Sequence, residues 1–106
     1  MIDVQVIVVV MTLATLVMIP ASSFGTNRVP WFPYLSLTFA FQGALLFPLA
    51  MGTAVPFKVG VMESLFGLLW LVMVVYLRQR IAFWSAVALT ACSTLNLLCG
   101  IALMWV

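Results

Sequence analysis

Histidine is absent from this chain of 106 residues, and this absence removes several classes of chemistry. Without histidine there is no conventional axial ligand for haem or chlorophyll and no histidine-based copper or di-iron site. A Ser-His-Asp or Cys-His catalytic arrangement is excluded for the same reason. The chain also lacks a glycine-rich phosphate loop. We therefore expect no enzyme, at most a subunit of an enzyme complex, with no cofactor or metal bound through ligands of its own.

Charged residues are also scarce in this chain. Four Lys or Arg and two acidic residues make up 6% of the chain, whereas a typical soluble domain carries about 25%. Hydrophobic residues make up 67%, and the mean hydropathy is +1.34. Four scattered cations form no basic patch for nucleic acid. This composition excludes a soluble enzyme, a disordered regulator and a nucleic-acid binder, identifies no soluble substrate, and predicts an integral membrane protein.

Four apolar stretches are each long enough to cross a bilayer, whose hydrocarbon core needs roughly 20 helical residues. They cover residues 4–21, 34–53, 59–77 and 81–105. None alternates with the period of two that is typical of a membrane barrel strand, and lipid otherwise accepts only helices. We therefore expect an all-α membrane protein, a four-transmembrane-helix bundle with short loops, forming a single integral membrane domain over residues 1–106.

The basic residues divide unequally between the two sides of such a bundle. Arg28, Arg78 and Arg80 fall in loops on one side. Lys58 and both termini fall on the other. The positive-inside rule therefore favours termini outside the cytoplasm, and we expect a bacterial inner membrane. Asp3, with no Lys or Arg near it, gives the first stretch the wrong charge for a secretory signal, so we expect a retained helix.

Glu63 is the one acidic residue inside an apolar stretch. It lies four residues into the third stretch, roughly 6 Å along the helix axis. An intramembrane carboxylate is a functional hypothesis by default, as a proton or cation site. Three interpretations stay open: a structural group that snorkels to the interface or pairs with Lys58 near the positive helix end, a coupling or relay group, and a contact to Arg or Lys of a neighbouring subunit.

Two faces of small and polar residues predict close helix packing, because small residues at helical spacing let backbones approach. The face on the third stretch consists of Gly60, Glu63, Ser64 and Gly67, with Leu65, Leu69, Val72 and Tyr76 on the opposite, lipid-facing side. The face on the fourth stretch consists of Ser85, Ala88, Cys92, Asn96 and Cys99. We expect Asn96 to form a hydrogen bond across a helix interface, since it lies near the middle of its stretch.

The two cysteines are predicted to be packing residues. Cys92 and Cys99 lie seven residues apart on one stretch, roughly 10.5 Å along a helix. That separation excludes a disulfide between them. With no histidine as a third ligand, the pair also falls short of a metal site.

The second stretch carries Gln42 among the small residues Ala40, Ala44 and Gly52, with Pro48 near its end. Pro48 removes the backbone hydrogen bond to Ala44, so we expect a kink. A kinked helix with freed carbonyls can line a cation or quinone site, and plain bundle packing is the alternative. Gln42 is a candidate polar partner for Asn96 or Glu63.

The stretch from Tyr34 to Leu46 with Gln42, followed by Glu63 in the next predicted helix, is distantly similar to the small antiporter-like subunits of respiratory complex I and membrane-bound hydrogenases. The similarity covers about a third of the chain, and the second intramembrane acid of some such subunits is missing. It implies a coupling role for Glu63 within a larger complex.

These features predict a non-catalytic accessory or structural transmembrane subunit of a larger membrane complex, an energy-transducing one of respiratory, photosynthetic or ion-translocating type. Its expected partners are membrane lipids and other membrane protein subunits, and contact with lipid or quinone stays open. The alternative is a small homo-oligomeric transporter or channel, coupled to protons or cations, that uses Glu63.

Overall fold

The computed structural model describes residues 4–23, 31–77, 79 and 83–105, and within the helices it describes the side chains of all of these except 19–23 and 31–35. The described residues form four helices and no strand: α1 (Val4–Ser23), α2 (Trp31–Ala50), α3 (Pro56–Tyr76) and α4 (Phe83–Met104). The prediction of an all-α protein is therefore confirmed.

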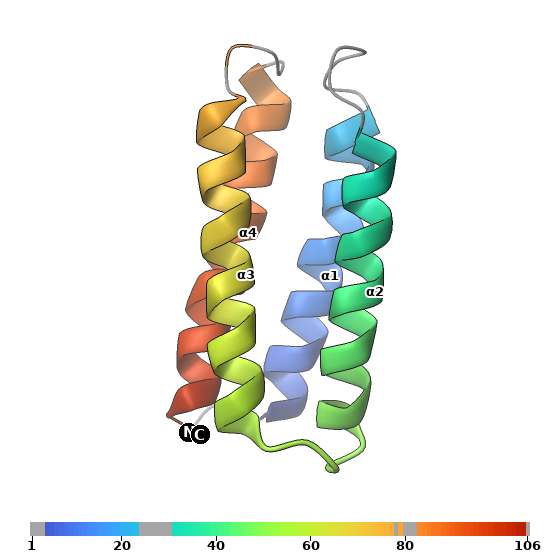
Figure 1. The fold of residues 1–106 in the computed structure, drawn as a ribbon, viewed down its shortest axis with the longest axis vertical. Helices are drawn as coiled ribbons and strands as arrows, with labels where there is room; N and C mark the ends of the chain where they lie inside the picture. The colour runs from blue at the N-terminus through green and yellow to red at the C-terminus, as the bar shows by residue number, and fades with distance from the viewer. Residues whose placement is uncertain (1–3, 24–30, 78, 80–82, 106) are drawn as a thin grey trace.

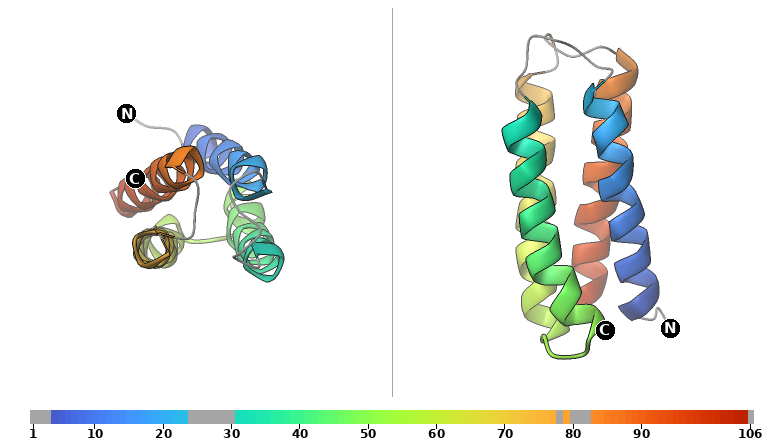
Figure 2. Two further views of the ribbon diagram at one scale, coloured as in Figure 1. Left: turned by 90° about the horizontal axis from the view of Figure 1, so that it is seen from above. Right: turned by 90° about the vertical axis from the view of Figure 1, so that its right-hand side faces the viewer.

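The helices run along the long axis of a particle that measures 40 × 21 × 18 Å (Figure 1). Each helix is antiparallel to the next in the chain, so the start of α1 and the end of α4 lie at the same end. Seen along the axis, α1 lies between α4 and α2, and α3 lies beside α4 (Figure 2). The most extensive packing joins α3 to α4, followed by α1 to α4 and α1 to α2, whereas α2 and α3 share few contacts.

Two of these helices are long and apolar enough to cross a membrane. They are α3, with 21 residues, and α4, with 22. In α1 and α2 the stretches with described side chains, Val4–Met18 and Ser36–Ala50, are apolar but shorter. Two candidate spans are consistent with a membrane location, and the four-span bundle stays a prediction.

The end of α2 is set by a glycine. Gly52 adopts φ +77°, a backbone conformation that favours glycine because other residues have a Cβ. The N–H of Thr53 donates to the carbonyl of Pro48 at 3.0 Å, and the N–H of Gly52 donates to that of Leu49 at 3.2 Å. This pattern is a Schellman motif. It ends the helix at Ala50, three residues before the end of the apolar stretch.

The start of α3 is set by a proline. Pro56 occupies the first turn after Val55, a position where the missing N–H of proline costs nothing because helix ends leave that donor unused. The helix therefore begins three residues earlier than the predicted stretch. Glu63 consequently lies seven residues from the helix start, roughly 10.5 Å along the axis, and deeper than the sequence predicts.

The interface between α3 and α4 is a contact of backbone with backbone. A Cβ added at Gly60 would lie 2.5 Å from the carbonyl oxygen of Gly100, and one added at Gly67 would lie 2.8 Å from the backbone nitrogen of Leu97. A Cβ at Gly100 would lie 2.7 Å from the backbone nitrogen of Ser64. Only glycine permits this approach, which is the arrangement that small residues support in membrane helices.

The core consists of two apolar clusters at different levels along the axis. One contains Ala14, Met18, Trp70, Val74, Leu89 and Cys92. The other contains Ile7, Met11, Leu46, Leu49, Val59 and Leu103. On the antiparallel helices, the positions of Glu63 and Asn96 fall between these clusters. A polar layer therefore separates the two halves of the core.

Candidate functional site

Three buried polar side chains from three helices meet in this layer. Glu63 on α3 is 0% exposed, Gln42 on α2 is 5% exposed and Asn96 on α4 is 6% exposed. The sequence names all three as candidates, and the structure brings them together. We refer to them below as the polar triad.

The two amides of the triad are joined in a directed chain. Gln42 Nε2 donates to Asn96 Oδ1 at 2.8 Å, and Asn96 Nδ2 donates to the backbone carbonyl of Glu63 at 3.1 Å. The other atom of the Gln42 amide group lies 2.5 and 2.9 Å from the two carboxyl oxygens of Glu63. The triad thus links α2 to α4, α4 to α3, and α3 back to α2.

Two further contacts hold α2 against α3 beside the triad. Trp70 Nε1 donates to Thr38 Oγ1 at 3.1 Å, so the buried indole has a polar partner on α2. Phe41 stacks on Phe66 with ring centroids 4.3 Å apart and an angle of 17° between the rings. Since α2 and α3 share few other contacts, these side chains and Gln42 account for much of the packing of α2 against α3.

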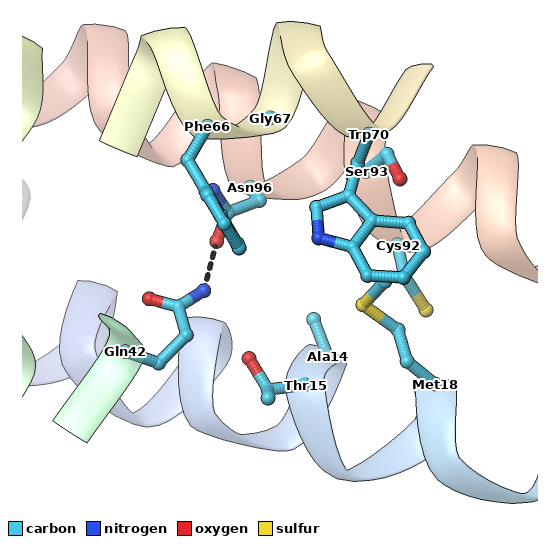
Figure 3. Close-up of a pocket in the computed structure, with 10 residues that line it drawn as sticks. All are labelled: Ala14, Thr15, Met18, Gln42, Phe66, Gly67, Trp70, Cys92, Ser93 and Asn96. Carbon is cyan, nitrogen blue, oxygen red and sulfur yellow. Dashed lines mark hydrogen bonds between the residues drawn. The ribbon is translucent and has the colours of Figure 1, made fainter. Parts of the chain in front are cut away.

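A small cavity adjoins the triad (Figure 3). The space open to the centre of a water molecule is about 10 Å³, which is close to the minimum for one water. Its polar lining comes from Thr15, Gln42, Ser93 and Asn96. The hydroxyls of Thr15 and Ser93 donate to backbone carbonyls of their own helices, at 2.9 and 2.7 Å. The space is therefore about the size of one water molecule.

A shallow groove runs between α1 and α2 and shares two lining residues, Thr15 and Gln42, with the cavity. Its space is about 170 Å³, and Thr12, Leu16, Phe39, Gly43 and Leu46 complete its lining. A Cβ at Gly43 would have nothing within 4 Å. Gln42 thus stands between this outer groove and the buried carboxyl of Glu63.

The interpretation of Glu63 as a snorkelling or Lys58-paired group is wrong. Its side chain is fully buried, whereas Lys58 is exposed. The physical reason is the early start of α3, which places Glu63 two turns inside the helix and on the face toward α2 and α4.

Of the remaining candidates, Gly60, Ser64 and Gly67 lie at the α3–α4 interface, whereas Cys92 on α4 belongs to a core cluster that includes Ala14 and Met18 of α1. Gly60, Gly67, Ser85 and Cys92 are buried, whereas Ser64, Ala88 and Cys99 are half-buried. On the opposite side of α3, Leu65, Leu69, Val72 and Tyr76 are exposed, as the spacing predicts. Both cysteines are free. Within the described part of the chain, no three His, Cys, Asp or Glu side chains gather as a metal site.

Sequence reasoning missed several buried residues of α4. They are Leu89, Ser93, Gly100 and Leu103. Ser93 and Gly100 are small and seven residues apart, so the spacing rule applied to the predicted face would have found them as a second row. It also missed Thr38, the α2 partner of Trp70, for which the sequence carries no signal.

Of the charged residues used to predict the orientation and the retained first helix, the structure describes only Lys58. Asp3, Arg28, Arg78 and Arg80 all fall outside the described residues. Which side the termini face therefore stays a prediction.

No protein-family model matches this chain, and neither a curated protein nor a solved structure is similar to it. Function is therefore inferred from the geometry of the bundle.

Proposed function

We propose that this chain is an integral membrane protein, a four-helix transmembrane bundle, that serves as a non-catalytic accessory subunit of a larger membrane complex. The observation that carries the proposal is the direction of the side chains. Large apolar side chains of every helix point outward: Leu13, Phe47, Leu65 and Leu98 are each more than half exposed. Such a surface needs lipid or another apolar protein to cover it.

The polar groups of the described helices support this placement. Among the described residues, Lys58 and Glu63 are the two charged ones, and Glu63 is buried against amides. The long axis of 40 Å agrees with a bilayer that measures about 40–45 Å with its headgroups. In agreement with the prediction from the sequence, we propose that this membrane is the bacterial inner membrane and that both termini lie outside the cytoplasm.

The outer face of α2 favours a partner subunit over lipid alone. Ser36, Ala40, Gly43 and Ala44 are exposed there, and small residues of this spacing let a second helix approach closely. A membrane-embedded acid such as Glu63 is typical of proteins that handle protons or ions. We therefore propose that the complex is energy-transducing, and that lipid or quinone contact, where it occurs, lies in the groove between α1 and α2.

Native mass measurement tests the accessory role. The complex is extracted from its own membrane in mild detergent, transferred to lipid nanodiscs and weighed. We expect this chain in a fixed ratio with larger membrane subunits. A chain that appears only as a free monomer contradicts the proposal.

A second candidate is a small homo-oligomeric transporter or channel in which Glu63 binds a proton or cation. The observation that favours it is that Gln42, the neighbour of Glu63, also lines the outer groove. Liposomes with the purified chain would then show proton or cation flux, and Glu63→Gln would abolish it. Absent flux, or flux unaffected by Glu63→Gln, removes this candidate.

A further inference from the structure

We propose that Glu63 is a proton-binding site, in which the neutral carboxylic acid donates its O–H to Gln42 Oε1 and closes a ring of three hydrogen bonds through the polar triad. The ligand of the site is a single proton taken from water. The site does not depend on whether the chain is an accessory subunit or a transporter.

The direction of the hydrogen bonds carries this inference. The backbone carbonyl of Glu63 can only accept, so the Asn96 atom that faces it at 3.1 Å is the donor Nδ2. Asn96 therefore turns its Oδ1 toward Gln42 and accepts from Gln42 Nε2. The remaining atom of the Gln42 amide is Oε1, and it faces the Glu63 carboxyl. Because Oε1 only accepts, the hydrogen between the two groups must come from Glu63.

An ionised Glu63 leaves the triad unsatisfied. If Gln42 turns over, its Nε2 donates to the carboxylate, but its Oε1 then faces Asn96. Asn96 must turn over as well, and its Oδ1 then opposes the Glu63 carbonyl. One buried pair of oxygens always remains in contact without a hydrogen between them, which is costly in a dry interior. The acid form instead keeps all three hydrogen bonds of the triad, with the second carboxyl oxygen of Glu63 at 2.9 Å from Gln42 Oε1 as its one close oxygen pair.

The distances agree with an acid. The Gln42 amide lies 2.5 and 2.9 Å from the two Glu63 oxygens, and the single acid hydrogen belongs in the shorter contact, at the lower end of the range of about 2.5–3.0 Å for O–H···O hydrogen bonds. The shorter contact is below the range of about 2.7–3.2 Å for N–H···O. The triad also offers too few oxygen ligands for Ca²⁺ or Mg²⁺, which take about six or more. A proton therefore suits the site, and Ca²⁺ or Mg²⁺ does not.

The groups that face Glu63 provide no fixed counter-charge. The described side chains of α1 and of α2, over Val4–Met18 and Ser36–Ala50, include no titratable group. On α3 itself, Lys58 and Tyr76 are exposed. On α4 the titratable side chains of the described residues are Cys92 and Cys99, and Cys99 is within electrostatic reach of Glu63. A buried carboxylate without a cation is strongly disfavoured.

Loss of the proton has a structural consequence. Both amides must reverse, and the bond from Asn96 to the Glu63 backbone, which joins α4 to α3, is broken. The contact of Gln42 that holds α2 changes at the same time. Proton binding at Glu63 thus selects between two arrangements of the triad, which makes it a two-state element that three helices share.

Infrared spectroscopy tests the site on the unmodified protein. Glu63 is the only glutamate in the sequence, so glutamate carrying ¹³C at its side-chain carboxyl labels this one group. In lipid nanodiscs at neutral pH we expect a carboxylic-acid C=O stretch that moves with the label and is absent from Glu63→Gln. Carboxylate stretches without the acid band would overturn the proposal.

Two further measurements test the ring and the ligand. Gln42→Met removes the acceptor, so the acid band should move to higher frequency, whereas Gln5→Met, which removes the amide that donates to Ala50 far from the triad, should leave it in place. Circular dichroism confirms helicity in both variants. Added sodium chloride at constant pH should not change the band. The assignment of Glu63 as a proton site is contradicted if the frequency of the acid band is unchanged in Gln42→Met, or if the band disappears when sodium chloride is added.

Discussion

Gln42 and Asn96 are 54 residues apart in the chain, and their side-chain amides are joined by a hydrogen bond of 2.8 Å in the middle of the bundle. This bond connects α2 directly to α4 across the shared interior. Asn96 extends it to the backbone of α3. A single asparagine on α4 therefore connects three helices.

Replacing Asn96 should weaken the bundle. Asn96→Leu leaves Gln42 Nε2 without its acceptor and the Glu63 carbonyl without its donor, both in a buried layer. Side-chain hydrogen bonds between membrane helices contribute about 0.6 kcal/mol on average, and an orphaned buried group costs about 1–3 kcal/mol. We expect the free energy of unfolding to fall by about 1–3 kcal/mol, measured by denaturant titration in mixed micelles. The exposed Thr90→Ala on the same helix is the control and should change stability little.

Two substitutions at Glu63 should differ in their effect. Glu63→Gln supplies an N–H in place of the acid O–H, so Gln42 Oε1 keeps a donor and stability should stay within about 1 kcal/mol of the original protein. Glu63→Leu removes the donor and should cost about 1–3 kcal/mol. Thermal unfolding in detergent compares the two. Equal losses for both variants would show that the charge of Glu63, rather than its donated hydrogen, stabilises the bundle.

Alanine substitutions at two glycines should differ in their effect on stability, because one glycine is closely packed and the other is open. Gly67→Ala places a Cβ 2.8 Å from the backbone of Leu97 and must push α3 away from α4, at a cost of about 1–3 kcal/mol. Gly43→Ala on α2 meets nothing within 4 Å and should be neutral or slightly stabilising, since alanine favours helix. Unfolding measured side by side checks this, and a destabilising Gly43→Ala would contradict the open environment of that residue.

Substitutions on the outer face of α2 should reduce assembly with partner subunits and should have little effect on folding. Gly43→Leu fills the small-residue face and should reduce recovery of partner subunits at least severalfold, while the isolated chain keeps its stability. Ala91→Leu, at an exposed position on α4, is the matched control. Quantitative co-purification with both variants measures the effect. Equal recovery with Gly43→Leu and Ala91→Leu would remove α2 as the contact face.

Local patterns in the sequence determined the all-helical class, the four apolar stretches and the small-residue face of α3. Helical spacing is a local property, so Gly60, Glu63 and Gly67 share a face wherever the helix packs. The scarcity of charged residues likewise predicted that the helices have apolar surroundings. The ends of α2 and α3 also have local causes in Gly52 and Pro56, although the apolar stretches alone placed both ends three residues too far along the chain.

Only the tertiary structure decided which faces meet. The spacing of residues on α4 does not say that Gly100 opposes Gly60, because a helix pattern specifies a face but neither its partner nor its level along the axis. The same holds for Gln42 and Asn96. Their contact depends on the axial shift and the rotation of α2 relative to α4. The burial of Glu63 follows from that packing, since side chains from three separate helices must close around it. The sequence alone thus marked Glu63 as unusual, and the fold surrounded it with two amides whose direction assigns its proton.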